Sequence, residues 1–180
     1  FIGMGKMGTP MALNIQKAGY LMVVYDAREE ATRPLLDGGA RLAGSAAEVA
    51  QLSDVVATCL PRPQVVEQVV NGPEGILEGI RPGGIYIDMS TCGPDLIRRL
   101  EPLFKQKGAH VMDTPVLSSP VDALDRGLIV MAGGDREIFD RLHPILDAFA
   151  DKVQAQILLH GHEPAEQGFS TPNTRQVILD

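Results

Sequence analysis

The 180-residue sequence contains no tryptophan, and only 4% of its residues are aromatic. Bases of single-stranded nucleic acids usually stack on aromatic side chains, so this composition argues against such a platform. Positive charge is also scarce, because 16 Lys and Arg against 23 Asp and Glu give a net charge of -7. Nucleic-acid binding depends on cations that neutralise phosphates, and we therefore expect no nucleic-acid partner.

Long apolar runs and cysteine clusters are missing as well. No stretch approaches the about 20 apolar residues that a helix needs to span a bilayer, and none resembles a signal peptide. The two cysteines, Cys59 and Cys92, lie in or beside predicted strands, which is typical of reduced thiols. His160 and His162 have no Cys or Asp pattern beside them, so no metal site is predicted. We expect a cytoplasmic protein without a membrane partner.

Short apolar runs alternate with helical stretches along most of the chain. This alternation is typical of βα units, and it predicts an α/β fold with a doubly wound, mostly parallel sheet between two layers of helices. The predicted strands are residues 1–2, 21–25, 55–60, 85–89, 110–112, 128–131 and 153–158. The predicted helices are residues 7–17, 29–36, 45–51, 63–70, 94–107 and 135–150.

A glycine-rich turn follows the first predicted strand. Gly3, Gly5 and Gly8 form the pattern G-x-G-x-x-G, with Met4 and Met7 between them. The first glycine permits a tight turn, the second lets the backbone approach a pyrophosphate, and the third lets the helix pack closely on the strand. The helix that begins here offers free N–H groups and a positive dipole end to phosphates. The pattern predicts a dinucleotide site of the Rossmann type.

Asp26 stands at the end of the second predicted strand. A carboxylate at this place can accept hydrogen bonds from both hydroxyls of an adenosine ribose, and it repels a 2′-phosphate. NAD is therefore the expected cofactor and NADP the less favoured one, although Arg28 could still reach a 2′-phosphate. The structural alternative is an ordinary βα turn with a solvated aspartate.

Residues 3–26, GMGKMGTPMALNIQKAGYLMVVYD, resemble the opening of the β-hydroxyacid dehydrogenases. That family includes 3-hydroxyisobutyrate dehydrogenase, tartronate semialdehyde reductase and 6-phosphogluconate dehydrogenase. The segment Met-Gly-x-Pro-Met-Ala at residues 7–12 is more specific than the glycines, since a general Rossmann protein does not need it. The resemblance covers nearly all of residues 1–158 and continues in CLP at 59–61, DMST at 88–91, DTPV at 113–116 and MAGG at 131–134.

The resemblance implies functions for residues that follow two later strands. The main chain of Leu60 and Pro61 would border the nicotinamide, Thr91 would lie near the nicotinamide ribose, and Ser90 would lie near the substrate. From the residues alone, Pro61 can equally end a strand and Thr91 can equally cap a helix.

Two departures from the family concern the substrate side. Family members usually carry Ser-Gly-Gly after Asp-x-Pro-Val, whereas this chain has Leu117-Ser118-Ser119. Ser118 and Ser119 can still donate hydrogen bonds to a substrate, but serine tolerates positive φ poorly. The family's general acid/base is a lysine on the helix after the Rossmann domain, and no lysine follows Lys152 here. We therefore assign no catalytic residue and expect the chain as given to be inactive, because a positioned proton donor contributes about 10²–10⁴-fold.

We interpret residues 1–158 as a dinucleotide-binding domain whose first strand is truncated, and residues 159–180 as an irregular tail. Since only two residues precede the glycine turn and there is no initiator methionine, we read the sequence as a fragment, and we expect the family's helical C-terminal domain to be absent from it. The expected function is the cofactor-binding part of an oxidoreductase that transfers a hydride between NAD and a small 3-hydroxy acid, with a homo-oligomer possible for the intact protein. The alternatives are a non-catalytic NAD(H)-binding or interaction module of the same fold, and an NADP-preferring imine- or sugar-phosphate-reducing enzyme, against which Asp26 argues.

Overall fold

A sheet with helices on both faces forms the centre of the molecule. The computed structural model describes residues 1–117, 129–150, 157–160 and 176–179. The helices are α1 (Gly8–Lys17), the 3-10 helix η1 (Glu29–Thr32), α2 (Arg33–Asp37), α3 (Ala46–Leu52), α4 (Pro63–Asn71), α5 (Ile76–Gly79), α6 (Pro94–Gln106) and α8 (Arg136–Ala150). The strands are β1 (Val23–Val24), β2 (Arg41–Leu42), β3 (Val55–Thr58), β4 (Ile85–Asp88), β5 (His110–Asp113), β6 (Val116–Leu117), β7 (Ile129–Gly133), β8 (Ile157–His160) and β9 (Gln176–Leu179).

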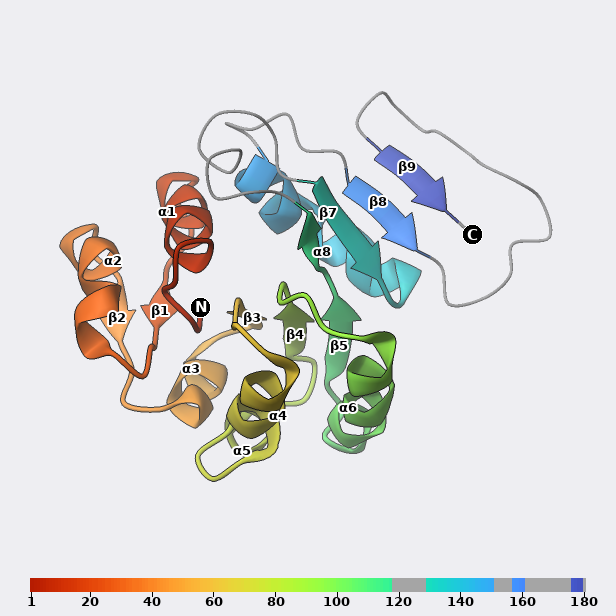
Figure 1. The fold of residues 1–180 in the computed structure, drawn as a ribbon, viewed down its shortest axis with the longest axis horizontal. Helices are drawn as coiled ribbons and strands as arrows, with labels where there is room; N and C mark the ends of the chain where they lie inside the picture. The colour runs from red at the N-terminus through yellow and green to blue at the C-terminus, as the bar shows by residue number, and fades with distance from the viewer. Residues whose placement is uncertain (118–128, 151–156, 161–175, 180) are drawn as a thin grey trace.

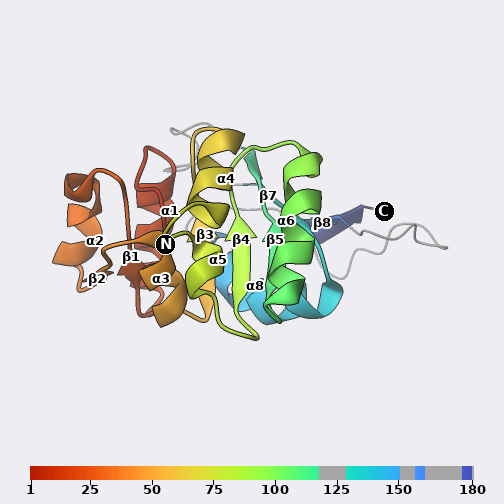
Figure 2. The ribbon, with the colours of Figure 1, turned by 90° about the horizontal axis from the view of Figure 1, so that it is seen from below.

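The strands are mostly parallel. β1 pairs with β2, β3 with β4 and β4 with β5, all in parallel, whereas β7 is antiparallel to both β5 and β6. β8 then continues parallel to β7, and β9 parallel to β8. Figure 1 shows α1 and α8 above β3, β4 and β5, with α8 behind β7 in this view, and α3, α4, α5 and α6 below them. Seen from below, α4, α5 and α6 lie in front of the strands (Figure 2). This is the α/β class that the sequence predicts.

Ile2 lies at the centre of the sheet. It forms parallel bridges both to Tyr25, just after β1, and to Thr58 at the end of β3. The first segment of the chain therefore lies between β1 and β3, and the chain order reverses direction at this point. Open α/β sheets bind ligands outside the carboxyl ends of their strands at such a reversal.

Strand β4 shows how the sequence builds the two core layers. Its side chains alternate between the faces, as strand geometry requires. Ile85 and Ile87 pack into the layer beneath α1 and α8, and Tyr86 packs into the layer beneath α4 and α6. The Tyr86 ring stacks on Phe104 of α6 with a centroid separation of 5.1 Å. An apolar run covered on both faces is typical of a central parallel strand.

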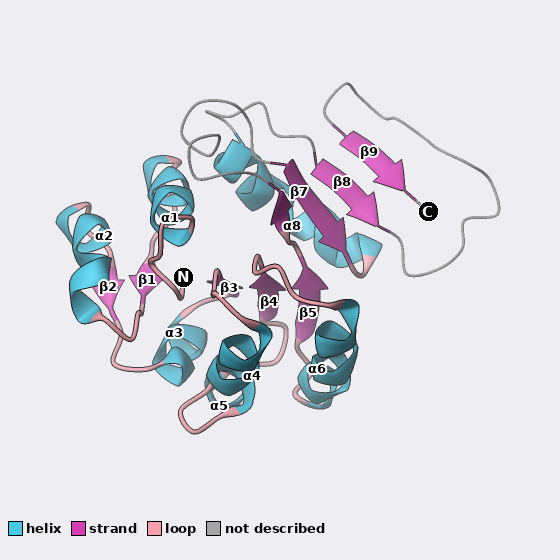
Figure 3. Cartoon of the chain, in the orientation of Figure 1, coloured by secondary structure: helices cyan, strands magenta, loops and turns pink. Residues whose placement is uncertain are grey.

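Several elements differ from the prediction in extent (Figure 3). The helix expected over 29–36 is divided into η1 and α2, with Pro34 in the first turn of α2, where its missing N–H costs no hydrogen bond. The strand expected at 153–158 is found at Ile157–His160. Within the tail expected to be irregular, Gln176–Leu179 forms a strand beside β8. Residues 161–175 lie outside the described part of the chain, as do Ser118 and Ser119. No helix among the described residues is both long and apolar enough to cross a membrane.

Candidate functional site

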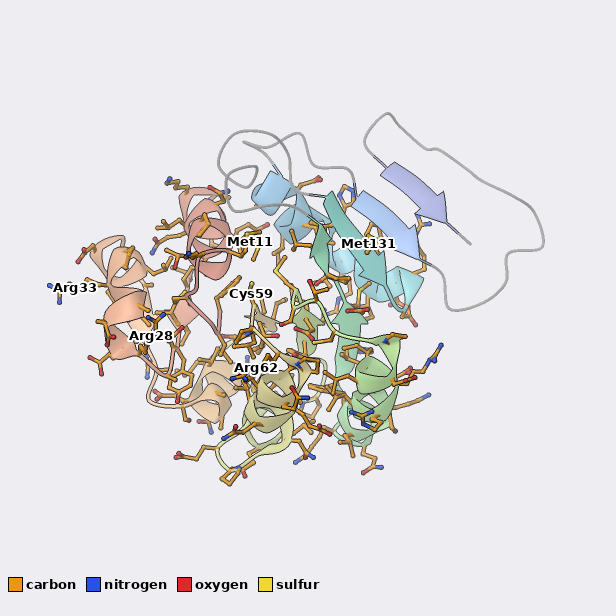
Figure 4. The ribbon with its side chains drawn as sticks, viewed as in Figure 1. Met11, Arg28, Arg33, Cys59, Arg62 and Met131 are labelled. Atoms are coloured by element: carbon orange, nitrogen blue, oxygen red, sulfur yellow. The ribbon has the colours of Figure 1, made fainter. Side chains whose placement is uncertain are left out.

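A cavity of about 700 Å³ opens at the carboxyl edge of the sheet, beside the reversal at Ile2. It is bordered by segments that are far apart in the sequence. These are the glycine loop (residues 3–8), the end of β1 (25–28), the end of β3 (59–61) and the region of α3, α4 and the α4–α5 turn. Figure 4 labels Arg28 on the β1 side and Arg62 at the start of α4. The fold thus gathers most of the predicted cofactor residues around one cavity.

The three glycines of the loop differ in what surrounds them. Gly3 has φ +94, and a Cβ there would collide with the main-chain carbonyl of Cys59. A Cβ on Gly8 would collide with the carbonyl oxygen of Gly3, so helix and turn could not pack as closely. At Gly5 an added Cβ would meet no atom within 4 Å. The fold itself therefore does not require glycine at position 5, and the free space there is where a pyrophosphate would approach the backbone.

Asp26 is held by main-chain groups on both sides of the cavity mouth. Its Oδ2 accepts a hydrogen bond from Met4 N at 2.6 Å, and its Oδ1 accepts one from Arg28 N at 2.9 Å. A carboxylate has about four acceptor positions, so two remain for hydroxyl groups of a ligand. The sequence did not indicate the bond to Met4, whose side chain is buried in the core below.

Three cations near this edge have no acidic partner among the described residues. Six arginines elsewhere form ion pairs with aspartate or glutamate. In contrast, the part of the chain that the structure describes has no ion pair to Lys6 and Arg28, which border the cavity, or to Arg62, which precedes α4. In a chain of net charge -7, unpaired cations beside a cavity favour an anionic ligand. Sequence reasoning overlooked Lys6, although its place between the glycines would have indicated it.

Ser90 lies beneath the loop that follows β3. Only 3% of Ser90 is exposed, and its Oγ accepts a hydrogen bond from Leu60 N at 2.9 Å. Ser90 therefore positions the main chain of Leu60 and Pro61, both of which border the cavity, but does not itself line it. Thr91 is exposed and is also outside the cavity lining.

The last residues of the neighbouring strands β4 and β5 are both aspartates. Asp88 of β4 and Asp113 of β5 are partners in the parallel register. Asp88 Oδ1 accepts hydrogen bonds from Thr58 Oγ1 at 2.9 Å and from Ser90 N at 3.0 Å. Among the described residues, Asp88 Oδ2 and Asp113 Oδ1 are buried and have no hydrogen-bond partner. Burial raises the pKa of both carboxyls, and together with the charge of Asp88 it raises the pKa of Asp113 to about 6.

The same surroundings keep both thiols protonated. Burial raises the pKa of Cys59 to about 11, and the charge of Asp88 acts in the same direction. Burial and the two carboxyls raise the pKa of Cys92 to about 12. Nucleophilic cysteines need a lowered pKa, so neither thiol has the character of a catalytic nucleophile. No group of three potential metal ligands gathers within the described ranges of the chain.

Comparison with known proteins places this geometry in a family. Residues 1–157 match the model of the NAD binding domain of 6-phosphogluconate dehydrogenase. An NAD-dependent L-serine dehydrogenase from Pseudomonas aeruginosa is 36% identical over 153 residues, which are 85% of this chain and 51% of that protein.

Solved structures show the same relationship. The 3-hydroxyisobutyrate dehydrogenase of Mycobacterium tuberculosis, in a structure with L-serine, is 31% identical with a TM-score of 0.79, and the match covers 89% of this chain and 53% of that one. Psf3 in complex with NADP+ and 2-OPP is 26% identical with a TM-score of 0.78, over 86% of this chain and 55% of that one. The chain spans about half the length of the serine dehydrogenase and of the 3-hydroxyisobutyrate dehydrogenase. It belongs to the β-hydroxyacid dehydrogenase group of the 6-phosphogluconate dehydrogenase family and is an NAD(P)-binding domain of that group.

Proposed function

We propose that the chain binds NAD in the cavity at the carboxyl edge of the sheet, as the cofactor-binding part of a dehydrogenase for small 3-hydroxy acids. The observation that carries this proposal is the placement of Asp26, whose carboxylate is bonded to Met4 N and Arg28 N beside the open space at Gly5. Bound nicotinamide cofactor supplies hydride transfer. The residues of this chain bind and orient it.

In the proposed complex, the predicted cofactor residues of the glycine loop face the pyrophosphate. The main chain at Gly3, Gly5 and Gly8, together with Met4 and Met7, forms the loop over the pyrophosphate, and the start of α1 directs its N–H groups toward it. Lys6 adds a positive charge on the solvent side of the same loop.

The nicotinamide half would extend toward the end of β3. There Leu60 and Pro61 border the cavity, and Ser90 holds the Leu60 main chain in position. Thr91 is exposed just after β4 and does not line the cavity, so it would contact the nicotinamide ribose only where the ribose extends beyond the cavity.

The preference for NAD over NADP follows from charge. A 2′-phosphate would lie against the Asp26 carboxylate, which repels it. Arg28 is the opposing influence, because it borders the cavity and has no acidic partner among the described residues. We therefore propose a preference for NAD and not a complete rejection of NADP. The name of the serine dehydrogenase relative specifies NAD, whereas the Psf3 complex holds NADP+.

The substrate class is inferred from the relatives. L-serine and 3-hydroxyisobutyrate, named for two of them, are both 3-hydroxy carboxylic acids that differ in the substituent at carbon 2. We propose that the whole protein oxidises such an acid or reduces the corresponding aldehyde, that it works in the cytoplasm, and that it forms a homo-oligomer. The alternative is a non-catalytic NAD(H)-binding module of the same fold.

A turnover assay with the 180-residue chain separates cofactor binding from catalysis. NADH fluorescence should change on binding. NADH formation from NAD with 3-hydroxyisobutyrate or L-serine should stay at background, because we propose that these 180 residues hold the cofactor and do not include the family's lysine proton donor. Turnover at the rates of ordinary enzymes, about 1–10³ s⁻¹, would contradict the assignment of a cofactor-binding part alone.

A further inference from the structure

The cavity continues beyond Asp26 into a region between α3 and α4. Ser45 and Ala46 border it at the start of α3, and the turn at residues 73–75 borders it after α4. Ser45 fixes the start of α3, because its Oγ accepts a hydrogen bond from Glu48 N at 3.1 Å. If Asp26 binds the ribose of the adenosine half, this region is where the base of that nucleoside would lie.

The walls of this region are apolar and its rim is polar. Val65 and Val69 stand four residues apart on one face of α4, and Pro73 and Ala46 add further apolar surface. At the exposed rim, the side chains of Gln68 and Glu74 can form hydrogen bonds with a ligand edge. Apolar walls with a few polar groups are typical of sites for small aromatic ligands.

Glu74 is the other polar group at the rim, and its backbone is unusual. It is the only non-glycine residue with positive φ in the described part of the chain, at φ 55. The turn is held on both sides, since Glu74 O accepts a hydrogen bond from Ala47 N at 2.8 Å and Gly75 N donates one to Gly72 O at 3.0 Å. Glycine or asparagine would adopt this conformation more readily. Strained backbone of this kind gathers at ligand-binding positions, so the strain is consistent with a use for the Glu74 side chain.

We propose that Glu74 reads the edge of the adenine base, with Gln68 beside it, and that this selects adenine over a 6-oxopurine. The proposal rests on the NAD-binding function above. An ionised carboxylate is only an acceptor, and the exocyclic amino group of adenine is a donor. Hypoxanthine carries a carbonyl oxygen at the same place, so the two acceptors would repel each other. Binding sites that form a hydrogen bond with one group of a ligand bind analogues without that group much more weakly.

Calorimetric titration of the full 180-residue chain with NAD and with nicotinamide hypoxanthine dinucleotide tests this inference. The chain should bind NAD about 10-fold or more tightly than the hypoxanthine analogue. Glu74→Gln should reduce this ratio to about threefold or less, because a carboxamide can turn to present either a donor or an acceptor. Glu78→Gln is the matched control: it makes the same charge change at an exposed position of α5 outside the cavity lining, and should keep the ratio.

A second variant separates recognition from folding. Glu74→Gly relieves the positive φ, so the melting temperature of the free chain should stay equal or rise while the ratio is lost. An unchanged ratio in Glu74→Gln, or equal affinities in the wild-type chain, would overturn the adenine-reading inference and leave NAD binding intact. Failure of NAD itself to bind would overturn both proposals.

Discussion

Asp26 connects two parts of the cavity mouth through main-chain hydrogen bonds. Met4 N belongs to the glycine loop and Arg28 N to the segment after β1, and both donate to the same carboxylate. The side chain therefore has two functions in our account, since it fixes the loop that faces the phosphates and offers its remaining acceptor positions to the ribose.

Substitution Asp26→Ala should change cofactor preference more than it changes the fold. The ratio of NADP to NAD dissociation constants should fall about 10-fold or more, because charged hydrogen bonds contribute about 1.5–3 kcal/mol and the repulsion of a 2′-phosphate is lost as well. Calorimetry with both cofactors measures this ratio. Asp37→Ala, which removes an exposed carboxylate outside the cavity lining, is the control and should leave it unchanged. If Asp26→Ala also leaves the ratio unchanged, another residue sets the preference.

The loop glycines allow a paired experiment. Gly8→Ala should destabilise the chain by about 1–3 kcal/mol, because its Cβ would collide with the Gly3 carbonyl. Gly5→Ala should leave the melting temperature nearly unchanged, since its Cβ would meet no atom of the described residues within 4 Å, but should weaken NAD binding about 10-fold by occupying the space for the pyrophosphate. Thermal melts and calorimetry on both variants check this division. Tight NAD binding by a folded Gly5→Ala chain would contradict the position assigned to the pyrophosphate.

At the scale of elements, the carboxyls at the ends of β4 and β5 make the free energy of unfolding depend on pH. The pKa of Asp113 is raised to about 6 in the folded chain, from an ordinary value of 3.8, by burial and by the charge of Asp88. The folded state therefore holds this proton more tightly than the unfolded state does. The resulting contribution to stability is complete below about pH 4 and is lost as the pH rises through 6.

Asp113→Asn should remove this pH dependence. The variant should gain stability over the wild-type chain at pH 7, on the order of 1 kcal/mol after allowance for partial solvent screening, and the gain should vanish near pH 4. Urea unfolding at several pH values between 4 and 7 measures the difference. Asp95→Asn, at an exposed position of α6, should follow the wild-type profile. Parallel profiles for Asp113→Asn and the wild-type chain would show that Asp113 does not titrate in this range.

Helices and strands with a recognisable pattern of side chains could be predicted from the sequence, whereas those held only by backbone hydrogen bonds could not. The helix predicted over residues 45–51 is found as α3, and at its start Glu48 N donates a hydrogen bond to Ser45 Oγ. Strand β2 went unpredicted because Arg41 and Leu42 are both exposed and pair with β1 through the backbone alone. Helix α5 is a four-residue helix, too short for a periodic pattern.

At the scale of the whole molecule, some residues of the candidate site could be predicted from the sequence and others could not. The glycine loop and Asp26 could be recognised from the sequence because they act through local backbone geometry at a strand end. The contacts that position Ser90 and Glu74 could not be predicted, since each joins a distant segment: Leu60 N bonds to Ser90 and Ala47 N bonds to Glu74. The reversal of chain order at Ile2 brings these segments to one edge of the sheet.

Calorimetric titration of the 180-residue chain with NAD and, separately, with NADP tests the central claim most directly. Our account predicts one site per chain with NAD bound more tightly than NADP, because the Asp26 carboxylate accepts the ribose hydroxyls and repels a 2′-phosphate. Equal affinities would contradict the function assigned to Asp26. The absence of binding for both cofactors would contradict the assignment of the cavity as a dinucleotide site.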